Sequence, residues 1–157
     1  MLSDLVRVEV HEARTAVPAG AGVEAGMVVL REIDEPHRLL RIVMGQPEAR
    51  AIHAKWSGEA AQRPGTWDLF VSVVSLLDAR LERGVITAVE DGRHYFASLE
   101  IDKGGQPLVL SCRPSDAIAL VLRAWGAELY AHRSVLDAAG VVDESPDAAG
   151  GVAPSGE

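Results

Sequence analysis

Apolar and polar residues alternate over several segments of the chain, and a period of two is typical of β-strands that bury one face. In the first segment, residues 5–10, the side chains of Val6, Val8 and Val10 share a face. The same reasoning predicts further strands over residues 27–33, 38–44, 81–89, 93–101, 107–112 and 128–131. Asp91-Gly92 separates two of them and predicts a tight hairpin. Residues 16–26 are rich in Ala, Gly and Pro, so we expect a flexible connection there.

Other segments place their apolar residues at helical spacing. This spacing predicts helices over residues 47–57, 67–79 and 114–126, with a last helical turn at 134–139. Pro47 and Pro114 suit the first turn of a helix, because the N–H that proline lacks would have no partner there. Thr66 is expected to be the N-cap of the second helix, where its hydroxyl can accept a hydrogen bond from a free backbone N–H.

The order of these elements predicts the fold class. Strands come before and after the helices and do not alternate with them one by one, which is typical of an α+β fold. We therefore predict a single domain at residues 1–140, with a largely antiparallel mixed β-sheet and about three packed helices. Residues 141–157 lack periodicity and aromatic side chains, so we expect a disordered acidic tail there.

Composition sets broader limits. The chain has 157 residues, of which 48% are hydrophobic, enough for one core. No apolar run reaches the roughly 18 residues of a membrane-spanning helix, and the N-terminus lacks the apolar block of a signal peptide. We expect a cytoplasmic protein. The formal net charge is −8, but residues 127–157 carry six acidic residues and only one basic residue, Arg133. The body is nearly neutral, so charge neither identifies nor excludes a nucleic-acid partner.

Cysteine and histidine offer little chemistry by themselves. The single cysteine, Cys112, excludes an intrachain disulfide, and its apolar strand predicts an inert core thiol. The five histidines lack the spacing of a zinc site. His53 lies on an Ala-rich helix and is expected to be a packing or surface residue, with proton transfer as the alternative.

Two Arg-Pro/Asp motifs carry the strongest chemical signal. Arg63-Pro64 precedes Asp68, and Arg113-Pro114 precedes Asp116. Each aspartate falls in the first turn of a predicted helix, where free N–H groups and the helix dipole favour a negative charge. Proline keeps the residue before it extended, which gives each arginine a defined direction. If the two helix N-termini are close, two carboxylates and two guanidinium groups converge.

These motifs resemble the signature of the bifunctional nuclease domain family. The first matching segment is Leu40-Arg41-Ile42-Val43-Met44-Gly45-Gln46-Pro47-Glu48-Ala49. The second is Arg63-Pro64-Gly65-Thr66-Trp67-Asp68-Leu69. The third and most specific is Ser111-Cys112-Arg113-Pro114-Ser115-Asp116-Ala117-Ile118-Ala119-Leu120-Val121. Together they place the resemblance over roughly residues 5–140.

The resemblance implies metal-assisted hydrolysis of DNA and RNA phosphodiesters. Asp68 and Asp116 would hold Mg²⁺ or Mn²⁺, which prefer carboxylate and water ligands, and Glu48 would complete the catalytic set. The substrate-binding set would comprise Arg63, Arg113, Thr66 and Ser115, with the two arginines clamping the phosphate. The implied partners are single-stranded nucleic acid and further copies of the chain, most simply in a twofold dimer. No membrane partner is expected.

The departures from the family pattern favour a second hypothesis. Trp67 stands where the family has histidine, Arg41 replaces a proline, and Ser111 replaces an acidic residue. The alternative is a non-catalytic, homo-oligomeric interaction or ligand-binding module. In it, the arginines and aspartates of the two motifs form cross-paired salt bridges that fix the geometry of the fold. Thr66 and Ser115 would then only cap helices, and the tryptophans would anchor the core or an interface.

Overall fold

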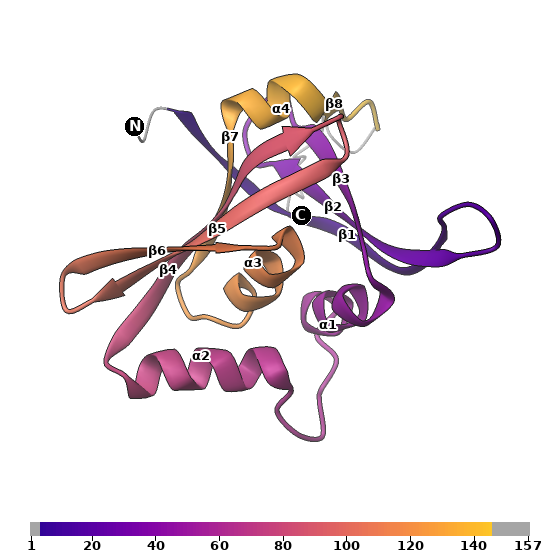
Figure 1. Ribbon diagram of the computed structural model, residues 1–157. Helices are drawn as coiled ribbons and strands as arrows, with labels where there is room; N and C mark the ends of the chain where they lie inside the picture. The colour runs from indigo at the N-terminus through magenta and orange to yellow at the C-terminus, as the bar shows by residue number, and fades with distance from the viewer. Residues whose placement is uncertain (1–3, 146–157) are drawn as a thin grey trace, which may run out of the picture.

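One mixed β-sheet organises the computed structural model of the protein, which describes residues 4–145. Its strands are β1 (Leu5–Pro18), β2 (Glu24–Glu32), β3 (Arg38–Met44), β4 (Ala79–Glu90), β5 (His94–Lys103), β6 (Gln106–Cys112), β7 (Glu128–His132) and β8 (Val141–Val142). They lie in the order β6-β5-β4-β7-β1-β2-β3-β8 (Figure 1). All neighbours are antiparallel except β4 and β7, which are parallel. The predicted α+β class with a largely antiparallel sheet is confirmed.

Four helices pack at different places on this sheet. They are α1 (Gln46–Trp56), α2 (Thr66–Leu76), α3 (Pro114–Val121) and α4 (Arg133–Ala139). Helix α1 contacts β1, β2 and α3, whereas α3 also contacts β4 and β5. Helix α4 lies at the opposite end of the molecule from α2 (Figure 1). None of the helices in residues 4–145 is long and apolar enough to cross a membrane.

A single core joins nine of these elements. Its largest side chains with almost no exposure include one each from β2, β3, α1, β4, α3 and α4. They are Leu30, Leu40, Ile52, Ile86, Ile118 and Leu136. Helix α2 contributes no buried residue, although its sequence is mostly apolar. The core therefore holds α1 and α3 firmly against the sheet and leaves α2 at the periphery.

The structure confirms one of two predicted connections between strands and corrects the other. At Asp91-Gly92 both residues have positive φ, 52° and 63°, and the backbone N–H of Arg93 donates to Glu90 O, so the predicted hairpin is confirmed. The last pair of the ladder is Glu90 with His94, so the loop has three residues. The flexible connection predicted at 16–26 is wrong. Strand β1 continues to Pro18 and pairs with Glu24 at the start of β2. The two strands pair through backbone hydrogen bonds, which do not require alternating apolar and polar side chains. Small residues can therefore extend both strands.

Three further boundaries differ from the predictions. Helix α3 ends at Val121, and the turn predicted at 134–139 is a helix, so residues 4–145 contain four helices. The chain predicted as tail from residue 141 begins with β8, which pairs with Arg38 and Leu39 of β3. The part of the predicted tail from residue 146 onward lies outside the described residues.

Candidate functional site

The two motif aspartates begin their helices in the same way. Asp68 accepts a hydrogen bond from the backbone N–H of Gly65 (2.8 Å), and Asp116 accepts one from the backbone N–H of Arg113 (3.3 Å). In both cases the aspartate is the third residue of its helix and satisfies the N–H of the N-cap residue. Gly65 is the N-cap of α2, so the prediction of Thr66 as N-cap is wrong by one residue, and the capping contact comes from the Asp68 carboxylate and not from a hydroxyl.

Glu48 reaches the same region from α1. A Cβ atom on Gly26 of β2 would lie 2.1 Å from the Cβ of Ala49, so only glycine lets α1 approach the strand this closely. Ala49 is fully buried by this contact. Its neighbour Glu48, in the first turn of α1, is thereby held beside the N-terminus of α3, where it meets Arg113.

Arg113 joins the two carboxylates. Its Nε donates to Asp116 Oδ2 and its Nη2 to Asp116 Oδ1, both at 2.9 Å, in a bidentate pair. The remaining Nη1 donates to Glu48 Oε1 at 3.3 Å. Hydrogen bonds from Arg113 lower the pKa of Asp116 against the opposing effect of burial, and the Trp67 indole N–H adds a smaller contribution. One guanidinium thus bridges α1 and α3.

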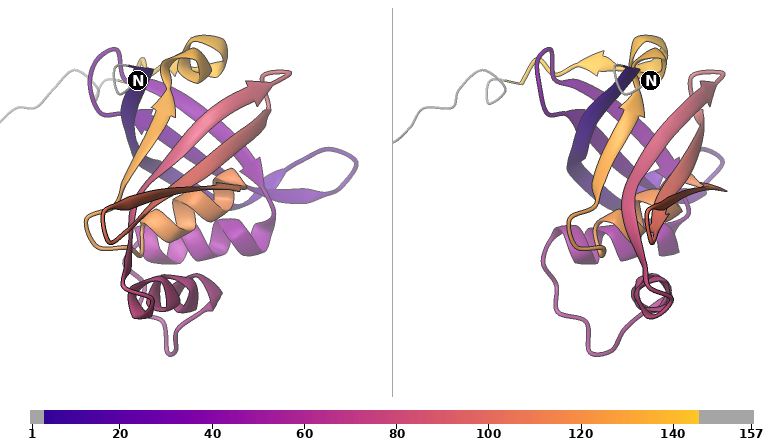
Figure 2. Two further views of the ribbon diagram at one scale, coloured as in Figure 1. Left: turned by 60° about the vertical axis from the view of Figure 1, so that its left-hand side comes forward. Right: turned by 90° about the vertical axis from the view of Figure 1, so that its left-hand side faces the viewer.

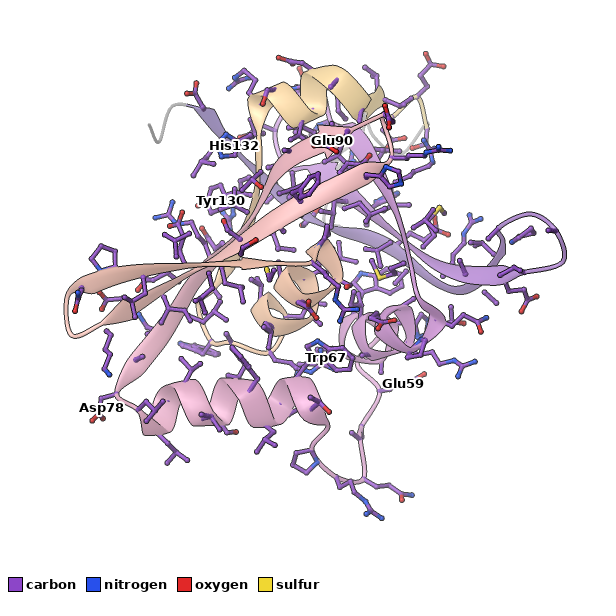
Figure 3. The ribbon with its side chains drawn as sticks, in the orientation of Figure 1. Glu59, Trp67, Asp78, Glu90, Tyr130 and His132 are labelled. Carbon is purple, nitrogen blue, oxygen red and sulfur yellow. The ribbon has the colours of Figure 1, made fainter. Side chains whose placement is uncertain are left out.

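A cavity of about 460 Å³ opens beside this ion-pair network. Its polar wall comes from the motif segments, and its apolar wall comes from α2, α3, β5 and β6. The lining residues are Glu48, Thr66, Trp67, Phe70, Leu99, Leu110, Ser111, Cys112, Arg113, Asp116 and Leu120. Figure 3 shows Trp67 at the N-terminal end of α2, turned toward α1 and α3. The two Arg-Pro/Asp motifs therefore meet at one cavity.

Arg123 is a buried arginine that the sequence did not single out. It contacts all three helices that surround Trp67. Arg123 follows α3, its side chain is 9% exposed, and its guanidinium carbon lies 6.0 Å from the centre of the Trp67 ring. Its terminal nitrogens donate to Ala119 O of α3 (2.8 Å) and to Ala51 O of α1 (3.0 Å). Its Nε lies 3.2 Å from Asp68 Oδ1 at an angle that gives an ion pair but no hydrogen bond.

The predicted site residues divide into two groups. Glu48, Thr66, Arg113 and Asp116 line the cavity together. Three others do not: Arg63 is exposed, Ser115 is buried against a neighbouring cavity, and Asp68 faces Arg123. The cross-paired salt bridges between the motifs are also wrong in their partners, because Arg113 pairs within its own motif and with Glu48, while Asp68 pairs with Arg123.

The remaining candidates are placed as follows. Cys112 lines the cavity, but burial and the nearby charge of Asp116 raise the pKa of its thiol to about 11, so the thiol stays protonated near neutrality. This agrees with the predicted inert thiol. His53 lies outside the cavity, 4.0 Å from Glu59 and edge-on to Trp56, in agreement with a surface or packing role.

A divalent metal would find two carboxylates at this cavity. Residues 4–145 contain no group of three or more His, Cys, Asp or Glu side chains arranged to hold an ion. Mg²⁺, however, often uses only one or two carboxylates and completes its shell with water and substrate phosphate. Glu48 and Asp116 fit that donor set, provided that the guanidinium of Arg113 leaves the place between them. Its side chain is 61% exposed, so it has room to move.

Comparison with known proteins agrees with these motifs. The family model described as the bifunctional nuclease domain matches residues 28–144. Two uncharacterised proteins, from two strains of Mycobacterium tuberculosis, are each 35% identical over 125 residues, which cover 78% of this chain and 73% of each relative. The chain belongs to the bifunctional nuclease domain family, whose model covers the strands, helices and motifs that build the cavity.

Replacing the buried arginine tests its role in holding the helices. Arg123→Ala leaves two carbonyl groups and Asp68 without their cation, so we expect a loss of roughly 2–4 kcal/mol in the free energy of unfolding. Chemical denaturation measures it. Arg63→Ala is the matched control, because it removes an exposed arginine from the loop before α2 and should change stability by less than about 0.5 kcal/mol. Equal losses of stability in Arg123→Ala and Arg63→Ala would contradict the role of Arg123 in holding the helices.

The pH dependence of stability tests the pair formed by Arg113 and Asp116. The pKa of Asp116 is lower in the folded protein than in the unfolded chain, so its ionised form stabilises the fold at neutral pH. This contribution is lost as the pH falls from about 4, the ordinary aspartate pKa, through the lowered folded value. Asp116→Asn should reduce stability at pH 7 and make the loss below pH 4 shallower. If the stability curves of the wild type and Asp116→Asn were parallel below pH 4, the contribution of the Arg113–Asp116 pair would be disproved.

Proposed function

We propose that the cavity binds single-stranded nucleic acid and hydrolyses a phosphodiester bond, with Glu48, Arg113 and Asp116 as the reacting set. One observation carries the proposal: three charged side chains, from two helix N-termini that are 65 residues apart in the sequence, converge on one cavity beside Trp67. The family described as the bifunctional nuclease domain supports the reaction class.

Arg113 is the phosphate-binding group in this proposal. A guanidinium presents two parallel N–H donors that match two phosphate oxygens as well as they match a carboxylate. The exposed side chain of Arg113 can exchange Asp116 and Glu48 for the phosphate without unfolding either helix. Arg63 is left out of this clamp, because it lies outside the cavity-lining residues.

Glu48 has two roles in this proposal: one carboxylate oxygen contributes to the metal site, and the other is the proton acceptor. Trp67 stands at the position of the family's histidine, and an indole N–H can only donate a hydrogen bond, so Trp67 cannot take a proton from water. The Trp67 N–H instead supports the ionised form of Asp116, and the ring offers a flat surface on which a base can stack. Glu48 is a carboxylate on the cavity wall whose side chain is 20% exposed, within reach of a water in the cavity.

Mg²⁺ or Mn²⁺ is the proposed metal, held by Glu48 and Asp116. Such an ion would polarise a phosphate oxygen and lower the pKa of a bound water. Asp68, the second ligand expected from the resemblance, is excluded from this set because its carboxylate is shared by Gly65 and Arg123. The guanidinium of Arg113 and the metal compete for the same two carboxylates.

A second candidate function is a non-catalytic ligand-binding module. The observation in its favour is the apolar part of the cavity, formed by Phe70, Leu99, Leu110 and Leu120. Apolar walls with a few convergent polar groups are typical of sites for small molecules. In this alternative Arg113 stays paired with Asp116 and Glu48, and the pair fixes the cavity wall.

Cleavage of a single-stranded oligonucleotide in the presence of Mn²⁺ tests the enzyme. Glu48→Gln removes the proton acceptor and nearly preserves shape, so we expect kcat to fall by about 10²–10⁴. Glu59→Gln, an exposed change after α1, is the matched control and should retain activity. Equal cleavage by the wild type and Glu48→Gln would identify a contaminant and refute the proposal.

Calorimetric titration with Mn²⁺ separates the two candidates. Arg113→Ala frees the carboxylates of Glu48 and Asp116, so the enzyme proposal predicts tighter Mn²⁺ binding together with loss of cleavage. The ligand-binding module predicts a lower melting temperature without Mn²⁺ binding by either protein. In that second outcome the metal-assisted reaction is excluded.

A further inference from the structure

A second cavity, of about 390 Å³, borders the candidate site at Arg113. Its walls are residues 42–45 at the end of β3, residues 93–96 at the start of β5, and residues 113–115 at the N-terminus of α3. We call it the β3–β5 cleft. Arg113 lines both the cleft and the candidate site, so the two cavities are neighbours that share one guanidinium.

The cleft lies between two strand edges of one curved sheet. Four strands, β4, β7, β1 and β2, separate β5 from β3 in the strand order, yet both strands line the cleft. In the right panel of Figure 2 the hairpin of β4 and β5 stands on one side of β7, and β1, β2 and β3 stand on the other. Strand β6 pairs with β5 only from Ala97 onward, and β8 pairs only with Arg38 and Leu39 of β3. Residues 94–96 and 42–44 therefore each face the cleft with an edge that has no strand partner in residues 4–145.

The charge of the cleft is opposite to that of the chain. The chain has a formal net charge of −8, but the cleft lining contains no acidic residue, and its two charged residues are Arg93 and Arg113. Arg93 is exposed and forms no ion pair within residues 4–145, so its guanidinium is available to an anion. His94, also exposed, adds a ring N–H donor. These donors suit a phosphate group.

An exposed aromatic ring accompanies these donors. Phe96 lines the cleft and is 46% exposed, so part of its surface is open to water. Sites for single-stranded nucleic acid combine a positively charged groove with aromatic side chains on which bases stack. Arg93, His94 and Phe96 supply both components within four consecutive residues of one strand end.

We propose that the β3–β5 cleft binds the nucleotides next to the scissile phosphate in a single-stranded nucleic acid. Arg93 contacts a phosphate of this flanking segment, and Phe96 stacks on one of its bases. This inference rests on the proposed function, because it extends the path of the same strand. A phosphate held by Arg113 lies at the border of the two cavities, so the adjoining nucleotide is directed into the cleft.

An extended acidic peptide is the alternative occupant. Its backbone could pair with an open strand edge, and its carboxylates could meet Arg93. The exposed ring of Phe96 favours the nucleic acid. Every base has a flat face that stacks on such a ring, whereas the negative face of an aromatic ring does not attract a carboxylate.

Fluorescence anisotropy of the full chain with a labelled oligothymidylate of about 12 nucleotides tests the cleft. EDTA in the buffer prevents metal-dependent cleavage during the measurement. Arg93→Ala should weaken binding and reduce the slope of log Kd against log salt concentration by about 0.7, the contribution of one phosphate contact on a single strand. Phe96→Ala should raise Kd by about 5- to 150-fold, the usual effect of losing one stacked base. Circular dichroism checks that both variants are folded.

Two matched controls lie outside the cleft. Arg14→Ala removes an exposed arginine from β1 and changes the net charge by the same amount as Arg93→Ala. Trp125→Ala removes an aromatic side chain that is 97% exposed. Neither control should change Kd or its salt dependence.

Cleavage in Mn²⁺ shows whether the cleft acts on substrate length. Arg93→Ala should raise the KM of the long oligothymidylate and leave its kcat unchanged, because Arg93 contacts only the flanking segment. Cleavage of a thymidine dinucleotide, which is too short to fill both cavities, should be the same in the wild type and Arg93→Ala. An equal loss on both substrates would place Arg93 in the reaction itself and overturn the inference.

The remaining results separate the cleft from the proposed function. Unchanged binding in Arg93→Ala and Phe96→Ala refutes the cleft even if the wild type cleaves. Binding that depends on both residues, without cleavage, supports the cleft and refutes the reaction. A wild type that binds no oligothymidylate overturns both proposals. If an oligoglutamate peptide then binds the wild type but not Arg93→Ala, the cleft is a peptide site.

Discussion

The position of α2 depends on a single buried cation, Arg123. Most helices in the described chain are fixed by side chains in the common core, but α2 contributes none. It is held by half-buried contacts and by one guanidinium that touches Trp67 and Asp68 while donating to carbonyl groups of α1 and α3. A buried guanidinium is costly unless it is paired and hydrogen-bonded, so this arrangement tolerates few alternatives. Arg123 thereby helps to hold α2 in place as one wall of the cavity.

Arg123 also explains why the two motifs have unequal roles. Both place an aspartate at the third residue of a helix, and locally they are the same structure. The difference lies in the nearest free cation. Asp116 meets Arg113 on the cavity wall, whereas Asp68 meets Arg123, which lies over the Trp67 ring and outside the cavity lining. Two similar sequences therefore supply one site residue and one structural residue.

The sequence predicted those features of the fold that depend on residues close together along the chain. Alternation and helical spacing located most strands and helices, and Asp91-Gly92 located its hairpin, because backbone geometry and neighbouring residues decide these features. Long-range contacts were not predictable in the same way. Arg123 is the lone charge at the end of the apolar segment that the sequence predicts as the third helix, and this isolation was the one available signal. Its partner Ala51 is 72 residues away, and a backbone carbonyl leaves no mark in the side-chain pattern.

Arg113 connects the resting geometry of the cavity with its proposed chemistry. Two carboxylates that face one cavity repel each other, and the interaction is strong where water is partly excluded. A cation between them relieves this repulsion, and in this structure Arg113 is that cation. If a divalent ion took this place, as proposed, the guanidinium would be released next to the cavity, where a phosphate could receive it. Metal and phosphate binding would then be linked through one exposed side chain, and each would strengthen the other.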